Sequence, residues 1–141
     1  MKYPSKYFGL CLLNIFFILI SFAQKKSIIN VVKDEKSNTV NILVGQKPFT
    51  SFIYPDSLEK PVLYPIYAAD DELVTRGYPL APRANEPTDH PHHFGLWLNY
   101  ANVNGINFWN NSSAIPAEKK PSYGWKKTTN VTEQTSDKKG W

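Results

Sequence analysis

The sequence predicts an all-β protein made of short strands joined by turns. Runs of β-branched and aromatic residues recur between Gly, Pro, Asn and Asp residues, which is typical of antiparallel strands. The 11 prolines are scattered so that no long stretch after residue 24 shows helical periodicity with capping residues. Aromatic residues make up 14% of the chain, which also favours strands over helices. We therefore expect one antiparallel β domain.

Residues 1–24 have the character of a secretory signal peptide. Lys2 and Lys6 give a positive start, an apolar run extends from Phe8 to Phe22, and a small-residue cleavage pattern follows. The run of about 15 apolar residues is shorter than the roughly 20 that a membrane-spanning helix needs. We therefore predict cleavage near residue 24, a periplasmic or secreted location, and no membrane association afterwards. An uncleaved N-terminal anchor is the alternative.

Four strands are predicted in the first half of the domain that residues 25–141 would form. Polar and apolar side chains alternate over the first of them, and Gly45 to Pro48 predict a turn after it. Pro65 restricts the third strand to a sheet edge or a bulge, because proline cannot donate a ladder hydrogen bond. Gly77 is expected to bend the fourth strand. The predicted strands cover residues 39–44, 49–54, 62–67 and 73–78.

The second half of the domain begins with a proline-rich loop. Prolines 79, 82, 87 and 91 force an extended loop, and long ordered loops in compact domains are usually functional. Apolar and polar side chains alternate over residues 93–100, which is the strongest strand signal in the chain. Asn104-Gly105 predicts a tight hairpin turn between two further strands. Residues 125–131 are a candidate edge strand.

Composition excludes several classes of function. The formal net charge is +4, and removal of Lys2 and Lys6 with the signal peptide leaves about +2, too weak a basic surface for nucleic acid. The single cysteine, Cys11, excludes a disulfide framework and a zinc site built on paired thiolates. Because Cys11 lies inside the predicted signal peptide, the exported chain would contain no cysteine, which suits an oxidising compartment.

The candidate chemistry is concentrated in Asp89-His90-Pro91-His92-His93, which contains all three histidines of the chain. In an extended segment His90 and His92 point to the same side, and Pro91 favours an extended backbone at His90. Such a pair can bind one divalent metal ion, with Asp89 orienting one of the rings. The histidines are equally suited to general acid or base catalysis or to contacts with substrate. Purely structural hydrogen bonding is the third alternative.

Aromatic and amide side chains close to the histidines favour carbohydrate as a ligand. His93 is expected to point away from the other two histidines, alongside Trp97 and Asn99. The rings of Trp97 and Trp109 suit the C–H faces of sugars, the amide of Asn99 suits hydroxyl groups, and the planar fork of Arg76 suits a carboxylate or polyol. The alternatives are that Trp109 belongs to the core and that Arg76 forms an ion pair with a nearby acid.

Four sequence blocks occur in an order that resembles a known family. They are Lys60–Ile66, Thr75–Leu80, Thr88–Trp97 and Val103–Ser112. Together they resemble the PmoA-like family of exported bacterial proteins, whose label is methane oxygenase PmoA. The resemblance implies a β-sandwich-like domain and a link to carbohydrate or glycoside processing, with the histidines lining the site. A non-catalytic sugar-binding or surface-interaction module and a metal-dependent oxygenase are the two alternatives.

The resemblance also implies that the chain covers only part of a domain. The resembled proteins continue past the position of Trp141 into further strands, so we expect residues 25–141 to be the N-terminal part of an antiparallel β-sandwich. A sheet with an uncovered face and unpaired edges is expected to be poorly stable by itself.

Overall fold

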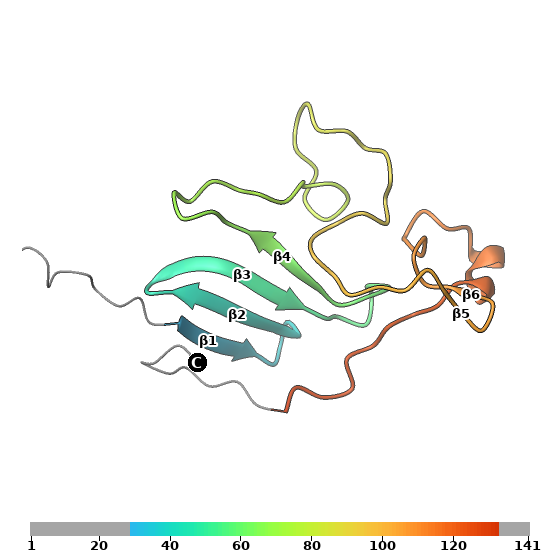
Figure 1. Cartoon of the computed structure of the whole chain (residues 1–141), viewed down its shortest axis with the longest axis horizontal. Helices are drawn as coiled ribbons and strands as arrows, with labels where there is room; N and C mark the ends of the chain where they lie inside the picture. The colour runs from blue at the N-terminus through green and yellow to red at the C-terminus, as the bar shows by residue number, and fades with distance from the viewer. Residues whose placement is uncertain (1–28, 133–141) are drawn as a thin grey trace, which may run out of the picture.

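The computed structural model describes residues 29–132 of the chain (Figure 1). The predicted signal peptide, residues 1–24, lies outside the described residues. Within the described part, no helix has the length and apolar character needed to cross a membrane. The all-β, antiparallel fold class is confirmed, because these residues form a four-stranded and a two-stranded antiparallel sheet and only one short 3-10 helix.

The larger sheet is a meander in which each strand pairs with the next along the chain (Figure 1). Its strands are β1 (Ile29–Asp34), β2 (Thr39–Val44), β3 (Lys47–Ile53) and β4 (Val62–Ile66). β2 confirms the strand predicted from alternation over the same residues. β1 precedes the first predicted strand and pairs with β2 over its whole length.

The turn between β2 and β3 is tighter than predicted. Val44 pairs with Lys47, so the loop consists of Gly45 and Gln46, and the predicted turn is wrong for Lys47 and Pro48. Gly45 has a φ of +66°. A two-residue hairpin requires positive φ in its loop, which glycine adopts without steric cost.

β4 is the last strand of the sheet, which confirms the edge position expected from Pro65. The pairing between β3 and β4 shifts in register between Thr50 and Phe52, a bulge-like irregularity. Beyond β4 the chain makes a long excursion, visible at the top of Figure 1, before it returns to this edge.

The strand predicted over residues 73–78 does not form. Leu73 makes a single bridge with Tyr67. Beyond it, the N–H of Ile66 donates to the side chain of Thr75, at 3.2 Å, and not to a backbone carbonyl. The N–H of Gly77 donates to Oε2 of Glu86 at 2.7 Å, and no neighbouring strand is paired with it. The side chain of Glu86, from the proline-rich loop, therefore accepts the hydrogen bond that a neighbouring strand would have accepted from Gly77.

The strand predicted over residues 93–100 is also wrong. Leu96 exchanges two backbone hydrogen bonds with Leu63 of β4, at 2.8 and 3.0 Å, but the pairing extends no further. Gly95 has a φ of +58°, which bends the chain before the bridge and prevents a regular ladder. The segment nevertheless lies against the exposed edge of the sheet.

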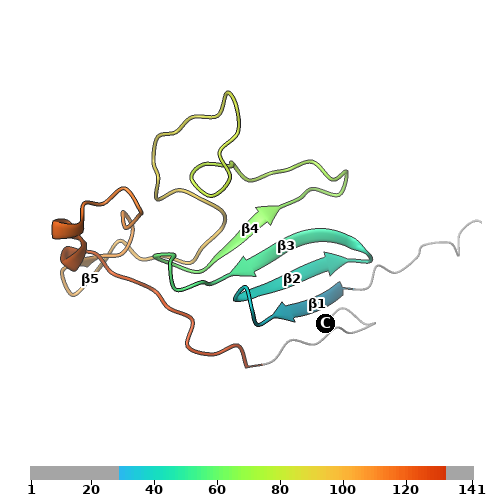
Figure 2. The same ribbon diagram turned by 180° about the vertical axis from the view of Figure 1, so that it is seen from behind.

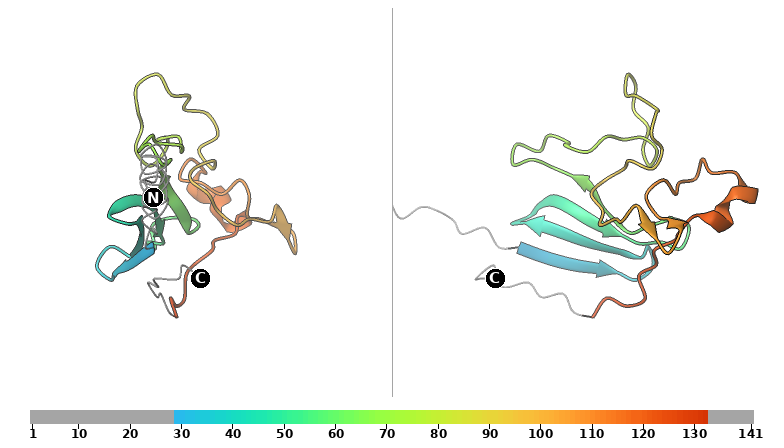
Figure 3. Two further views of the ribbon diagram at one scale, coloured as in Figure 1. Left: turned by 60° about the vertical axis from the view of Figure 1, so that its left-hand side comes forward. Right: turned by 45° about the vertical axis from the view of Figure 1, so that its right-hand side comes forward.

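The smaller sheet is a hairpin of β5 (Asn102–Val103) and β6 (Ile106–Asn107). The predicted Asn104-Gly105 turn is confirmed, with φ values of 52° and 86° that suit a tight hairpin. The 3-10 helix η1 (Ala117–Ser122) follows. The hairpin and η1 lie together beyond the end of the large sheet at which β4 begins (Figures 2 and 3).

Residues 125–131 are extended but form no strand. The N–H of Lys126 donates to the carbonyl of Glu59 at 3.0 Å. This bond ties the end of the described chain to the segment that precedes β4.

The apolar core of the described residues is small. Val40, Val62 and Phe94 are its buried hydrophobic side chains, whereas Leu98 is 92% and Tyr100 is 72% exposed. Since burial of apolar area is the main favourable term in folding, such a core predicts marginal stability.

Candidate functional site

The histidines lie on a turn and not on an extended strand. The N–H of His93 donates to the carbonyl of His90 at 2.9 Å. His90 has a φ of +48°, so the expectation that Pro91 holds it in the extended region is wrong. Hydrogen bonding across the turn outweighs the local preference of the residue before proline.

The turn brings all three imidazole rings together. His93 stacks on His90 with ring centroids 5.1 Å apart, and His92 meets the edge of His93 at 4.2 Å. The prediction that His93 points away from the other two is therefore wrong. The expectation that it lies beside Trp97 is confirmed, because their ring centroids are 6.0 Å apart.

Asp89 and His90 form a hydrogen-bonded pair at the surface. Oδ2 of Asp89 lies 2.7 Å from Nδ1 of His90, which confirms Asp89 as a residue that orients an imidazole. The hydrogen bond from His90 is the main cause that lowers the pKa of Asp89, and Arg76 adds to it. The carboxylate in turn favours the His90 tautomer that carries a proton on Nδ1 and leaves Nε2 free to accept one.

Arg76 holds the proline-rich loop beside the histidines. Its Nη2 donates to the carbonyls of Pro87 and Asp89 at 2.6 and 2.9 Å and lies 3.5 Å from the Asp89 carboxylate. The ion pair with a nearby acid that was the alternative for Arg76 is thus present, with Asp89, and the other arginine, Arg83, pairs with Glu86. Arg76 therefore holds in place the backbone of the loop that contains Asp89 and His90.

Arg76, His93 and the two tryptophans meet at a hollow of about 430 Å³. The rings of Trp97 and Trp109 lie 5.8 Å apart, and Trp109 also meets His93 edge to face at 5.8 Å. Trp109 is 39% exposed, so the alternative that it belongs to the core is wrong. The hollow is lined by Val74, Thr75, Arg76, His93, Phe94, Gly95, Trp97 and Trp109.

Three side chains that line this hollow each carry a nitrogen atom that is enclosed by the protein and has no hydrogen-bond partner among residues 29–132. They are Nε of Arg76, Nε2 of His93 and Nε1 of Trp97. A buried donor left without an acceptor costs about 1–3 kcal/mol. Because these atoms have almost no accessible surface, a ligand in the hollow contacts them only if the side chains shift.

Lys60 lies beneath the histidine turn and is 1% exposed. Its Nζ donates to the carbonyl of His92 at 2.7 Å and lies over the rings of Trp97 and Phe94, 4.2 and 5.0 Å from their centroids. Burial lowers the pKa of Lys60 to about 8, and the charge of Lys126 adds to this effect. Lys60 therefore joins the turn to the aromatic wall of the hollow.

The environment keeps two of the histidines neutral. Burial is the main cause that lowers the pKa of His92 to about 4, followed by the neighbouring His93, Lys60 and His90. The pKa of His93 is lowered by burial, then by His90, Lys60 and Arg76, with Asp89 opposing them. Neutral imidazoles can accept as well as donate a hydrogen bond near pH 7.

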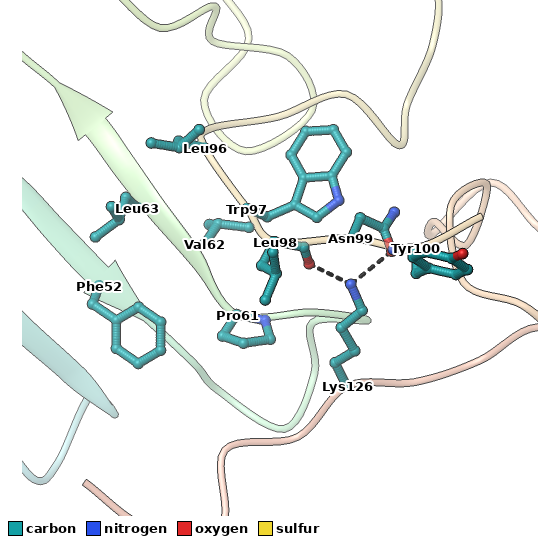
Figure 4. Close-up of a pocket in the computed structure, with 10 residues that line it drawn as sticks. All are labelled: Phe52, Pro61, Val62, Leu63, Leu96, Trp97, Leu98, Asn99, Tyr100 and Lys126. Carbon is teal, nitrogen blue, oxygen red and sulfur yellow. Dashed lines mark hydrogen bonds between the residues drawn. The ribbon is translucent and has the colours of Figure 1, made fainter. Parts of the chain in front are cut away.

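Asn99, which is predicted to contact substrate, does not line this hollow. Its Oδ1 accepts from Nζ of Lys126 at 2.6 Å and from the backbone N–H of Tyr100 at 2.8 Å. Asn99 lines a separate apolar groove of about 780 Å³ between β4 and the segment after Gly95, where Lys126 also donates to the carbonyl of Leu98 (Figure 4). Trp97 lines both cavities.

The metal site predicted on His90 and His92 gains no support. Among residues 29–132, no three His, Cys, Asp or Glu side chains are grouped so that they could hold a metal ion. The rings of His90 and His92 meet at 61° with centroids 5.8 Å apart, and Nδ1 of His90 already binds Asp89. The missing third ligand, and not the placement of these two rings, is what withholds support from a metal site in the described part of the chain.

Together, the fold and the site define an antiparallel β protein with a hollow lined by histidine, arginine and tryptophan beside the edge of its sheet. Residues 39–140 match a family of unknown function, DUF6807. Because the match spans most of the chain, the protein belongs to this family. The chain matches no curated protein and no solved structure.

Lys60 is the site residue that sequence reasoning missed. It opens the first of the four ordered blocks, but nothing in its neighbourhood distinguishes it from a solvated surface lysine. Its burial depends on Phe94 and Trp97, which reach it only in the folded chain. Thr75 and Val74 in the hollow were also not assigned to the site.

Proposed function

We propose that this protein binds carbohydrate in the hollow and that the histidine cluster acts on it as acid and base. The observation that carries the proposal is that two indole rings, Arg76 and His93 line one hollow. Sugars present apolar C–H faces for the rings and hydroxyl groups that accept or donate hydrogen bonds. A volume of about 430 Å³ lies within the range of small-molecule sites.

The Asp89–His90 pair supports an enzymatic function. With Nδ1 of His90 bound to the carboxylate, Nε2 has the arrangement of a general base that is oriented by an acid. His90 lies one ring away from the hollow, because it stacks on His93. Of the three histidines, only His93 lines the hollow. In this proposal a substrate anchored by Arg76 therefore extends past His93 to reach His90, which exchanges a proton with it, and His92.

One observation favours the alternative of a non-catalytic sugar-binding module. Among residues 29–132, no carboxylate lines the hollow, whereas most glycoside hydrolases use two carboxylates across the bond that they cleave. Hydrolysis by that mechanism is therefore not part of the proposal. If the histidines only hydrogen-bond, binding remains and chemistry is absent.

Titration of the full chain with neutral sugars tests the proposal. Glucose, galactose and their methyl glycosides serve as probes, and quenching of tryptophan fluorescence reports occupancy because Trp97 and Trp109 line the hollow. Trp109→Ala should weaken binding at least tenfold. Tyr100→Ala is the matched control, since this exposed aromatic residue lies outside the hollow. Absence of binding by the unaltered protein, or equal effects of both variants, would overturn the proposal.

The enzyme and the module are distinguished by His90→Gln. If the protein is an enzyme, this variant binds a sugar probe normally but no longer converts it, as followed by NMR of the sugar protons. If neither protein changes the probe although both bind it, the module is favoured. The metal-dependent oxygenase suggested by the PmoA-like resemblance would need a ligand set that residues 29–132 do not supply.

We also infer that the protein is exported to the periplasm or secreted. The support is the charged start and apolar run of residues 1–24. N-terminal sequencing of the protein from its native host should find a mature chain that begins near residue 25. An intact Met1 on the protein in the soluble extract would contradict the inference.

A further inference from the structure

We propose that the hollow takes a sugar acid, with the carboxylate of the ligand facing Arg76 and His93. This inference rests on the proposed function and narrows its ligand to a carboxylate-bearing sugar such as a hexuronate. It is drawn from the balance of charge in the lining of the hollow.

Arg76 brings a charged donor group to the lining of the hollow. Its Nη2 also donates to the carbonyls of Pro87 and Asp89, which hold the guanidinium in place. A neutral sugar hydroxyl accepts a hydrogen bond from such a group but does not compensate its charge. A carboxylate accepts several hydrogen bonds at once, and those from a charged donor are about twice as strong as neutral ones.

Positive charge at the hollow exceeds the negative charge that faces it. Arg76 lies in the wall, and Lys60 lies behind Trp97 and has no carboxylate within ion-pairing distance among residues 29–132. Asp89 is the acid nearest to Arg76, but its Oδ2 is bound to His90 and it is mostly exposed. Glu59 acts on Lys60 and raises its pKa, but it does not line the hollow. Among residues 29–132, Arg76 is therefore the charged side chain of the lining, and no carboxylate in the lining balances it.

The pKa of His93 agrees with an uncompensated cation at this place. It is lowered first by burial, which opposes any charge, and then by His90, Lys60 and Arg76, with Asp89 opposing them. The part of this effect that comes from Lys60 and Arg76 favours an anion beside His93. A ligand carboxylate would compensate Arg76 and Lys60 without requiring either histidine to become charged.

Titration with paired sugars provides the test. Glucuronate and galacturonate are compared with glucose and galactose, and acetate serves as a carboxylate without a sugar. We expect each uronate to bind at least tenfold more tightly than its neutral counterpart. This preference should fall as sodium chloride is raised from 20 to 500 mM, because salt screens the attraction between the carboxylate and the positive charges over this range. The salt series uses the unaltered protein, so it does not depend on how a variant folds.

Two arginine variants test whether Arg76 is the source of the preference for uronate. Arg76→Gln should reduce the preference for uronate to less than threefold, because the affinity for the uronate should fall much more than the affinity for the neutral sugar. Arg83→Gln is the matched control, because Arg83 also binds a carbonyl of this region but pairs with Glu86 and does not line the hollow. The control should keep the full preference.

The outcomes separate the inference from the proposed function. If neutral sugars bind as tightly as uronates, or if Arg76→Gln keeps the preference, the inference is wrong while carbohydrate binding stands. If acetate binds as tightly as the uronates, carboxylate recognition stands and the carbohydrate function is wrong. If none of the probes binds, both are wrong.

Discussion

Replacement of Gly95 by alanine should both unfold the edge of the sheet and displace the hollow. Gly95 stands between the histidine turn and the Leu96 bridge and has a φ of +58°. A Cβ atom at this position would lie 2.6 Å from the carbonyl oxygen of Leu63 and 3.2 Å from Cβ of Tyr64. The first contact is with backbone and cannot be relieved by a change of rotamer, so the two segments must separate.

The cost has two parts. A left-handed backbone costs an alanine about 1–2 kcal/mol relative to glycine. Separation breaks two hydrogen bonds between Leu63 and Leu96, each with a net value of about 1 kcal/mol. The expected loss is therefore about 3–4 kcal/mol, a large share of the roughly 5–15 kcal/mol that stabilises an ordinary domain.

Urea unfolding followed by tryptophan fluorescence measures this loss. With a slope of about 2 kcal/mol per molar urea, the midpoint should fall by roughly 1.5–2 M. Gly45→Ala is the matched control, because Gly45 also has a positive φ, of +66°, but a Cβ there would meet nothing within 4 Å. That control should lose only the backbone part, about 1–2 kcal/mol. Equal losses in the two variants would refute the steric argument at Leu63.

Three further predictions concern stability. The pKa of His92 is about 4 in the folded chain, against an ordinary value of 6.5. Between pH 4 and 6.5 the unfolded chain therefore binds more protons than the folded chain, so the free energy of unfolding should fall as the pH drops through this range. Because the ring is partly solvated, we expect a loss of about 1–2 kcal/mol, seen as a lower urea midpoint that His92→Gln makes less dependent on pH. The pKa of Lys60 is about 8 in the folded chain, against an ordinary value of 10.5, so the unfolded chain binds more protons between these values. The free energy of unfolding should therefore rise as the pH increases from 8 to 10.5, and Lys60→Met should abolish that rise. A Cβ at Gly124 would lie 2.3 Å from the ring of Phe108. Gly124→Ala should therefore lower the urea midpoint by an amount equivalent to about 1–3 kcal/mol. An unchanged midpoint would show that the ring can move aside.

Local signals predicted the regular part of the fold. The alternation over residues 39–44 predicted β2, and Asn104-Gly105 predicted the β5–β6 hairpin. Both depend on side-chain periodicity or turn chemistry within a few residues. Pro65 similarly placed β4 at an edge, because the missing N–H acts at that residue alone.

Residues 93–100 show why the other predicted strands failed. Their alternation is real, since Trp97 and Asn99 are half-buried while Leu96 and Leu98 are exposed. Alternation indicates which side chains of an extended segment lie on the same face, but it does not indicate whether a partner strand is present. The positive φ values of Gly95 and His90 fix the path of the chain, and at His90 the value opposes the preference expected before proline.

Four of the eight residues that line the hollow were assigned to a site from the sequence, but their geometry was not predicted. Arg76, His93, Trp97 and Trp109 meet at the hollow, as their residue types suggested. The turn that gathers the three imidazoles could not be derived from spacing, because spacing assumes an extended chain. Lys60 was missed because its environment is created by tertiary packing alone.

Trp97 has a consequence for how the two cavities behave. Trp97 lines the hollow and also the apolar groove beside β4, which Figure 4 shows, so a single indole is shared by two volumes. A molecule that enters either volume restricts the rotamers of the same side chain. Occupation of the groove would then change affinity in the hollow, and thermodynamic reciprocity requires the hollow's ligand to change affinity in the groove by the same factor.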